Sequence, residues 1–207
     1  MRQIWLVVAT FVLALGAFGV RPATAQEAGP GLAPEDHVMG QTDAPITIIE
    51  YASLTCPHCA EFDKETLPKL KAGWIDTGKA KLVFRIFPLN GLDLRAATLA
   101  SCAPPDRFYS FIDTLYQSQN NWTRASDPLQ ALGNIGRLGG VSEDRFKQCL
   151  ADEQLQKGIV AQAFTASKSY GVESTPTFFI NGTKMDPNGA QPIETFDKVL
   201  TAAQPKT

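Results

Sequence analysis

Two short apolar runs flank a longer amphipathic segment in the first half of the chain. Residues 46–52 and 81–87 are rich in β-branched and apolar side chains, as expected of strands that are buried on both faces. Between them, residues 57–77 place apolar side chains along one side of a predicted helix, which Pro68 should kink. This order predicts two parallel strands joined by a crossover helix.

The rest of the chain turns to helices and ends on a hairpin. From residue 92 to about residue 153, short helical segments, one of them over residues 143–150, are separated by Pro-Pro, Asp-Pro and Gly-Gly pairs. A longer helix over residues 154–170 follows. Residues 177–180 and 183–185 flank Asn181-Gly182, the preferred type I′ turn, and so predict a β-hairpin. A last helix is expected over residues 193–203, which completes an α/β pattern.

The N-terminus has the pattern of a secretory signal peptide. Seventeen residues without a charge, 4–20, are followed by Ala-Thr-Ala at 23–25, a form that signal peptidase accepts. The alternative is a helix that stays as a membrane anchor, but a helix needs about 20 apolar residues to cross a bilayer, more than the 17 found here. We expect cleavage after Ala25, export, and no stable membrane insertion of the mature chain. Residues 26–44, which include His37, are then a flexible and solvated tether.

Composition and charge narrow the class of protein further. Hydrophobic residues make up 44% and charged residues 19% of the 207 positions, which is enough apolar material for a folded core. Beyond residue 25 the chain holds 17 basic and 21 acidic residues and no basic run. Nucleic-acid binding is therefore not expected.

Four cysteines carry the candidate chemistry, because an exported chain meets an oxidising environment. Pro57 suits the first position of a helix, which makes Cys56 the N-cap and Cys59 the third helical residue, close enough for a disulfide. The positive end of the helix favours the Cys56 thiolate, and a protonated His58 would add to this effect. For each unit by which the pKa of Cys56 falls, the reduction potential of the disulfide rises by about 30 mV, so the disulfide becomes more oxidising.

Three other interpretations of this pair compete with redox activity. Haem attachment needs a histidine directly after the second cysteine, where Ala60 stands. A zinc site could combine the pair with Cys102 and Cys149, although these two lack the usual ligand spacing. A purely structural disulfide is also open, but so small a loop stabilises little. We favour redox activity, with no metal and no cofactor besides the disulfide itself.

Two motifs together resemble the DsbA family of periplasmic thiol:disulfide oxidoreductases. Residues 44–59, which end in Cys-Pro-His-Cys, resemble the active-site segment of that family, and residues 171–182 resemble its cis-proline segment. The resemblance implies a thioredoxin fold, in which helices flank a mixed central sheet. Residues 45–91 and 154–204 would form this domain, with the helical insertion at 92–153 between its halves.

The resemblance also implies roles for the residues around the first motif. Cys56 would be the attacking thiolate and Cys59 its partner, while Pro57 and His58 would be the dipeptide that tunes the potential. Glu50 stands six residues before Cys56 on an apolar strand. It is either an edge carboxylate in water or, as the family implies, a buried group that moves a proton for Cys59.

In the second motif, Pro176 resembles the cis-proline that faces the disulfide, and Thr175 would offer backbone hydrogen bonds to an extended substrate. Threonine at this position is also seen in disulfide isomerases and reductases of the superfamily, so the direction of the reaction stays open. DsbA-like proteins carry an additional disulfide in the insertion, which implies a structural pair of Cys102 and Cys149. Two buried free thiols are the alternative.

These observations lead to one main hypothesis and two alternatives. The main hypothesis is a monomeric periplasmic oxidase that introduces disulfide bonds into reduced, unfolded exported proteins and is reoxidised by a DsbB-like membrane protein. The first alternative is an isomerase or reductase that a DsbD-like donor keeps reduced. The second is a thioredoxin scaffold that only binds exported polypeptides.

Overall fold

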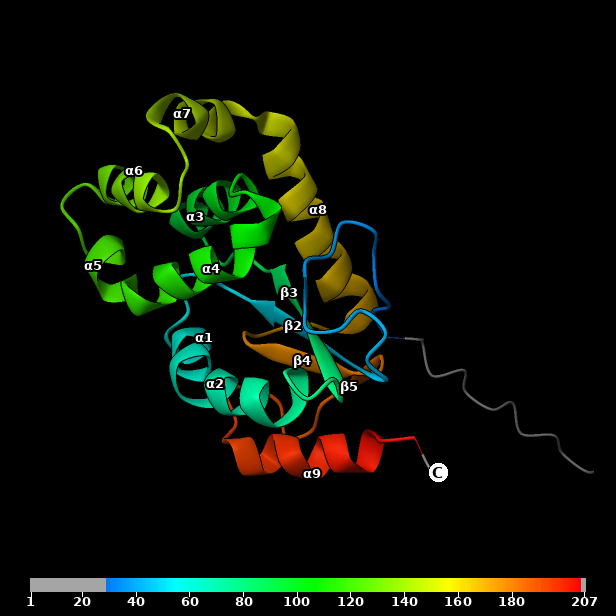
Figure 1. The fold of residues 1–207 in the computed structure, drawn as a ribbon. Helices are drawn as coiled ribbons and strands as arrows, with labels where there is room; N and C mark the ends of the chain where they lie inside the picture. The colour runs from blue at the N-terminus through cyan, green and yellow to red at the C-terminus, as the bar shows by residue number, and fades with distance from the viewer. Residues whose placement is uncertain (1–28, 206–207) are drawn as a thin grey trace, which may run out of the picture.

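A five-stranded mixed sheet forms the centre of the protein. The structure is a computed structural model that describes residues 29–205, so the expected signal peptide lies outside the described residues. The strands follow the order β1-β3-β2-β4-β5, in which only β2 and β3 are parallel neighbours (Figure 1). Their bounds are Val38–Met39 for β1, Ile46–Ala52 for β2, Ala80–Ile86 for β3, Thr177–Ile180 for β4 and Thr183–Lys184 for β5.

A nearly continuous helical segment follows β2 and forms the predicted crossover to β3. It consists of α1 (Pro57–Glu61), the π-helical stretch η1 (Phe62–Thr66), α2 (Leu67–Leu70) and a second π-helical stretch, η2 (Lys71–Ile75). Pro68 lies in the first turn of α2, directly after η1. Proline lacks the N–H that an α-helix needs, and a wider, π-helical turn directly precedes Pro68.

The insertion is a layer of helices that lies between β3 and α8 (Glu153–Tyr170) in the chain. It contains α3 (Gly91–Ser101), the 3₁₀ turn η3 (Pro105–Arg107), α4 (Phe108–Gln117), α5 (Gln119–Thr123), α6 (Pro128–Leu138) and α7 (Glu143–Ala151). Asn90, Asp127 and Ser142 cap the starts of α3, α6 and α7 with their side chains. Figure 1 shows these helices, in green and yellow, stacked beyond one end of the sheet.

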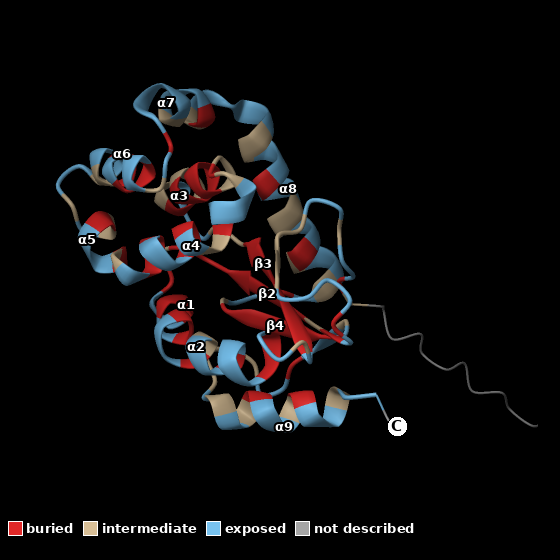
Figure 2. Ribbon diagram, viewed as in Figure 1, coloured by how far each residue is buried: buried red, intermediate tan, exposed pale blue. Residues whose placement is uncertain are grey.

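Side chains alternate between the two faces of the sheet, as the strand period requires. Ile48 and Phe178 pack on one face against η1, α2, η2 and α9 (Ile193–Ala203), whereas Tyr51 and Phe179 pack on the other face, near α8. Buried residues accordingly fill β2, β3 and β4 (Figure 2). Glu50 lies two residues after Ile48 on the same strand, so its side chain is on the face that η1 and α2 cover.

The described part of the predicted tether, residues 29–44, is held against the sheet. The guanidinium of Arg85 in β3 donates to both carboxylate oxygens of Asp36, at 2.9 and 2.7 Å, and to the Gly31 carbonyl at 2.6 Å. The Asp36 and Arg85 side chains are only 3% and 7% exposed. The expectation of a flexible tether is wrong for these residues, because their partner lies about fifty positions further along the chain.

The same segment makes a second set of contacts with the fold. Lys81 donates from Nζ to the carbonyls of Thr42 and Ala44, at 2.8 and 2.9 Å. His37, which we expected to be solvated, stacks on Phe108 with 4.0 Å between ring centroids. Residues 29–44, called the strap below, are therefore part of the folded protein.

Candidate active site

Cys56 sits where β2 turns into α1. It has extended backbone angles as the N-cap of α1, and Pro57 occupies the first helical position. Its side chain does not cap the helix, and in the protonated thiol form its Sγ donates to the Thr175 carbonyl at 3.3 Å. The Thr175–Pro176 peptide is cis, so the two motifs, more than one hundred residues apart, meet at the Cys56 sulfur.

The two thiols of this motif have opposite environments. The pKa of Cys56 is lowered to about 5, first by a hydrogen bond from the Cys59 thiol and then by Thr175 and the backbone N–H groups of Cys59 and His58, against the effect of burial. Burial raises the pKa of Cys59, and the neighbouring Cys56 and Glu50 raise it further. At neutral pH the free pair is therefore a thiolate at Cys56 and a thiol at Cys59.

The imidazole of His58 points away from this pair. Its Nδ1 lies 3.2 Å from Glu61 Oε2, and the side chain is 73% exposed. His58 acts on the Cys56 thiolate through its backbone N–H. Any contribution of the imidazole charge must cross solvent, where screening weakens it.

Glu50 is buried in the middle of the sheet, so the interpretation as an edge carboxylate is wrong. It pairs with Phe84 of β3 on one side and Phe178 of β4 on the other, and it is 2% exposed. Its Oε1 has no hydrogen-bond partner among the described residues. Burial, followed by the charges of Asp63 and Cys56, raises the pKa of Glu50 well above its usual range. Burial therefore favours the protonated form of Glu50 over the carboxylate.

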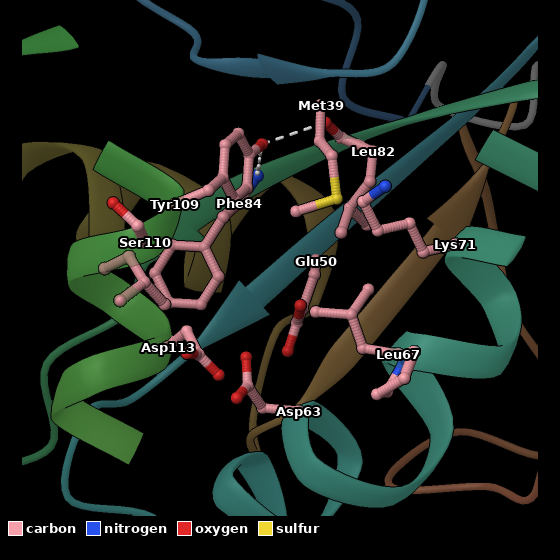
Figure 3. Close-up of a pocket in the computed structure, with 12 residues that line it drawn as sticks. Met39, Glu50, Asp63, Leu67, Lys71, Leu82, Phe84, Tyr109, Ser110 and Asp113 are labelled. Atoms are coloured by element: carbon pink, nitrogen blue, oxygen red, sulfur yellow. Dashed lines mark hydrogen bonds between the residues drawn. The ribbon is translucent and has the colours of Figure 1, made fainter. Parts of the chain in front are cut away.

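A cavity of about 280 Å³ opens beside Glu50, between β2, the η1–α2 segment and α4. Figure 3 shows the carboxyl groups of Glu50, Asp63 and Asp113 directed toward one another across it. The sequence analysis missed Asp63 and Asp113, because nothing in their spacing links a residue of η1 to one of α4. Within residues 29–205, no group of three histidine, cysteine or acidic side chains is arranged to hold a metal ion.

The other two cysteines form a disulfide between the end of α3 and α7. The Cys102 and Cys149 sulfurs are bonded, with 6.3 Å between the Cα atoms. Both thiols are used in this bond, so the four-cysteine zinc site that we considered is excluded. The bridge lies within the insertion and shares no residue with the Cys56–Cys59 pair.

A family model described as thioredoxin matches residues 32–202. The chain belongs to the thioredoxin family. Within that family it is similar to DsbA proteins: alpha-DsbA1 of Wolbachia pipientis has 33% sequence identity and a TM-score of 0.76, over 83% of this chain and 92% of that chain. The expected thioredoxin fold and the resemblance to DsbA are thereby confirmed.

Relatives of this thioredoxin-family chain carry related names. A putative protein-disulfide oxidoreductase of Rickettsia bellii is 36% identical over 152 residues, which is 73% of this chain and 59% of that protein. A probable disulfide bond formation protein D of Bacillus anthracis is 30% identical, over 78% of this chain and 77% of that protein. A protein-disulfide isomerase of Novosphingobium aromaticivorans has 25% identity and a TM-score of 0.71, over 83% of this chain and 99% of that chain.

In this DsbA-like chain, the insertion holds the loop that precedes Cys56. The buried carboxylate of Asp93, in α3, accepts hydrogen bonds from Ser53 Oγ at 2.5 Å and from the backbone N–H groups of Leu54 and Leu89 at 2.9 and 2.8 Å. Tyr116 of α4 donates to the Ser53 carbonyl at 3.2 Å. The sequence did not reveal these contacts, since they join segments about 40 and 60 residues apart.

Gln119 of α5 completes this support. It is 5% exposed, and its Nε2 donates to the carbonyls of Leu54 and Cys56, at 2.9 and 3.0 Å. Both amide hydrogens are thereby used on the active-site loop. Gln119 is a positioning residue, because it bonds the backbone of Cys56 without touching the sulfur.

Proposed function

We propose that this protein is a thiol:disulfide oxidoreductase that introduces disulfide bonds into exported proteins through Cys56 and Cys59. The contrast between the two thiols carries the proposal. Cys56 has a pKa of about 5 and is held at a helix N-terminus beside a cis-proline, whereas Cys59 is buried with a raised pKa. A low pKa stabilises the reduced form and so makes the disulfide oxidising.

The reaction follows from this contrast. A substrate thiolate attacks Cys56 Sγ in the Cys56–Cys59 disulfide, and the electron pair of the broken bond passes to Cys59 Sγ, which takes up a proton. A second substrate thiolate then attacks the substrate sulfur of the mixed disulfide. Cys56 leaves as a stable thiolate, the substrate gains its disulfide, and the enzyme is left as a dithiol.

Oxidation of a reduced, unfolded protein tests the proposal. With reduced ribonuclease as substrate and glutathione disulfide as oxidant, we expect the wild-type protein to accelerate recovery of ribonuclease activity. Cys56→Ala should abolish the acceleration, whereas the Cys102→Ala, Cys149→Ala double variant should retain it. A wild-type protein that is no faster than buffer would contradict the proposal, and binding without turnover would favour the scaffold alternative.

An isomerase or reductase is the second candidate, and Thr175 before the cis-proline favours it by resemblance. The solved structure from Novosphingobium that carries the name isomerase adds to this alternative. The redox state of Cys56 and Cys59 in cells separates the two directions. Alkylation after acid quenching should find mostly disulfide for an oxidase and mostly dithiol for an isomerase or reductase.

The proposal includes the compartment and the partners. The protein works in the periplasm, a location that its DsbA-like relatives support. It acts as a monomer on reduced, unfolded proteins, and a DsbB-like membrane protein reoxidises it. No helix within residues 29–205 has the length and apolarity needed to cross a bilayer. Fractionation of cells and sequencing of the mature N-terminus would test export and cleavage after Ala25.

A further inference from the structure

A chain of hydrogen bonds closes the turn on which Thr175 lies. The Thr177 hydroxyl, at the start of β4, donates to the Ser174 carbonyl at 2.6 Å and so joins the two ends of the turn. Asn188 Nδ2 donates to the same hydroxyl at 3.0 Å, and Asn188 Oδ1 accepts from the Phe178 N–H at 3.1 Å. Asn188, in the loop after β5, therefore holds both ends of this turn, one of them through Thr177.

The direction of this chain is fixed by the backbone. An N–H group can only donate, so the Phe178 N–H takes the amide oxygen of Asn188 and leaves the amide nitrogen for Thr177. Because the Thr177 oxygen accepts from that nitrogen, its one hydrogen goes to the Ser174 carbonyl. Thr177 is 0% exposed, so water does not compete for its hydroxyl.

The Asn188 side chain also takes the place of a strand residue beyond the end of β5. The Met185 N–H binds the Phe178 carbonyl at 2.9 Å, and Asn188 binds the N–H of the same residue. Both backbone groups of Phe178 are thereby paired on the β5 side, as buried backbone groups need to be. The outer edge of β4 is therefore held directly after the turn that contacts Cys56.

The loop that carries Asn188 is bound to the active-site helix as well. Gln191 Nε2 donates to the Asn188 carbonyl at 3.0 Å, and the Thr66 hydroxyl of η1 donates to the Gln191 carbonyl at 3.0 Å. The stretch η1 continues directly from α1, which contains Cys59. The loop therefore joins the helical segment of the redox pair to the turn of Thr175.

Thr175 is the residue that this arrangement places against the Cys56 sulfur. Its carbonyl lies 3.3 Å from Cys56 Sγ. The pKa of Cys56 is lowered first by the Cys59 thiol and then by the side chain of Thr175. Thr175 Oγ1 is buried with no hydrogen-bond partner within residues 29–205, which leaves this hydroxyl available to a thiolate at Cys56. A small displacement of the turn would change both contacts.

We propose that Asn188 and Thr177 are positioning residues, which hold Thr175 against the Cys56 sulfur and so set how the site stabilises its thiolate and receives a substrate. Neither residue touches the sulfur, and both act through the turn 174–177. The part of the inference that concerns substrates rests on the proposed function. The part that concerns the thiolate needs no substrate.

Thr177→Val and Asn188→Leu test the inference, because each replaces a polar side chain by an apolar one of similar size. In the reduced proteins, the ultraviolet absorbance of the Cys56 thiolate is followed as the pH changes. We expect both variants to raise the pKa of Cys56 by up to about one unit, the scale of one weakened hydrogen bond to a charged group. Thr177→Val leaves the Phe178 contact in place, so it tests the turn even if Asn188→Leu does not fold.

Three further variants make this titration specific. Thr177→Ser keeps the hydroxyl and should titrate like the wild type. The Thr177→Val, Asn188→Leu double variant should shift the pKa no further than the larger single shift, because the two residues act in one chain. Thr183→Val is the matched control, since it makes the same replacement at an exposed position of β5, and it should leave the pKa unchanged.

Unfolding in urea, measured on the same variants, separates positioning from support of the fold. A merely structural role would lower the free energy of unfolding and leave the Cys56 titration of the folded protein untouched. Thr177→Val and Asn188→Leu proteins that lose stability but titrate like the wild type would therefore overturn the proposal.

Reduction of the Cys56–Cys59 disulfide tests the part that concerns substrates. The rate with a reduced, unfolded peptide that contains one cysteine is compared with the rate with dithiothreitol, which has no backbone to pair with Thr175. We expect Asn188→Leu to slow the peptide about tenfold, as the loss of one or two hydrogen bonds would, and to slow dithiothreitol much less. A peptide rate that falls no more than the dithiothreitol rate would overturn this part.

The two measurements also distinguish this inference from the proposed function. If the pKa of Cys56 shifts in the variants but the wild type does not oxidise ribonuclease, the proposed function fails while the positioning of Thr175 stands. If the wild type oxidises ribonuclease and the variants match it in titration and in both rates, the inference fails alone.

Discussion

The same side chain behaves as two different chemical groups at positions 56 and 59. Cys56 lies at the end of the helix, where N–H groups without helical partners surround its sulfur, whereas Cys59 is fully buried. The difference decides which sulfur a substrate can attack and which can leave as a thiolate. It also confines the difficult proton transfer to Cys59.

The charge of His58 can be tested against the carboxylate that it contacts. We expect His58→Ala to raise the pKa of Cys56 and Glu61→Gln to lower it, because the Glu61 carboxylate binds the imidazole and offsets any positive charge on it. Both changes should stay below about one pH unit, since the groups are exposed and solvent screens them. Titration of the ultraviolet absorbance of the thiolate measures both pKa changes. No change in either variant would leave the Cys59 thiol, Thr175 and the backbone N–H groups as the causes of the low pKa of Cys56.

Asp63 should make the stability of the fold depend on pH. Burial raises its pKa from 3.8 to about 7 in the folded protein, so the stabilisation from its proton is complete below pH 3.8 and is lost as the pH rises through 7. The free energy of unfolding in urea should therefore fall between pH 5 and 8. Asp63→Asn should be the more stable protein at pH 8 by about 1–3 kcal/mol.

Glu65→Gln, from the same turn, is the control for the loss of one carboxylate. Glu50 contributes to the same trend, because its pKa is raised too, so some dependence should persist in Asp63→Asn. Wild type and Asp63→Asn losing equal stability between pH 5 and 8 would contradict this assignment.

Among the helices, α3 and α7 are joined covalently, and the Cys102–Cys149 bridge should act on stability alone. It closes a loop with a sequence separation of 47 residues. In the chain-entropy model, closing such a loop stabilises the folded protein by about 4 kcal/mol. The Cys102→Ala, Cys149→Ala double variant should therefore unfold about 10 °C lower in calorimetry. The rate at which Cys56–Cys59 is reduced serves as the control and should not change.

An unfolding temperature equal to that of the wild type would show that packing between α3 and α7 suffices without the bridge. A large change in the reduction rate would show instead that the insertion transmits strain to the active site. The second result is not expected from the positions of the residues, because Cys102 follows the end of α3, whereas Asp93, which binds the loop before Cys56, lies in its first turn.

At the scale of the whole molecule, the thioredoxin domain and the insertion meet at the active-site loop. Gln119 binds the carbonyls of Leu54 and Cys56 from the insertion side. Gln119→Met keeps the side-chain volume but leaves both carbonyls without this donor. The free energy of unfolding should fall by about 2 kcal/mol. Amide hydrogen exchange at Ala60, whose N–H binds the Cys56 carbonyl, should accelerate.

Gln130→Met is a suitable control, since Gln130 is exposed on α6 and far along the chain from the active site. It should leave both the stability and the exchange at Ala60 unchanged. Equal exchange in Gln119→Met and wild type would mean that α1 holds the loop by itself.

Local patterns predicted most of the elements. Strand β2 has the predicted bounds, and the Asn181-Gly182 turn has the positive φ angles, 49° and 79°, of a type I′ hairpin. The helices over residues 153–170 and 193–203 differ from prediction by at most one residue. Periodicity and turn chemistry are local, so a single sequence contains them.

Local sequence patterns could not predict the contacts between distant segments. The strap was taken for a tether because its composition is rich in glycine and proline, and the partners that order it, Lys81 and Arg85, lie on a later strand. Asp63, Asp93 and Gln119 were missed for the same reason. The motif predicted the two cysteines, whereas the groups that control them come from elements whose arrangement only the folded chain displays.

The short outer strands limit how unfolded polypeptides can pair with the sheet. An open sheet edge is a template onto which a foreign extended segment can add, and the proposed substrates consist of such segments. Here β1 and β5 are two residues long, and the strap with its Lys81 contacts continues the cover on the β3 side. The sheet therefore offers few unpaired backbone groups to unfolded polypeptides, which limits its co-aggregation with them.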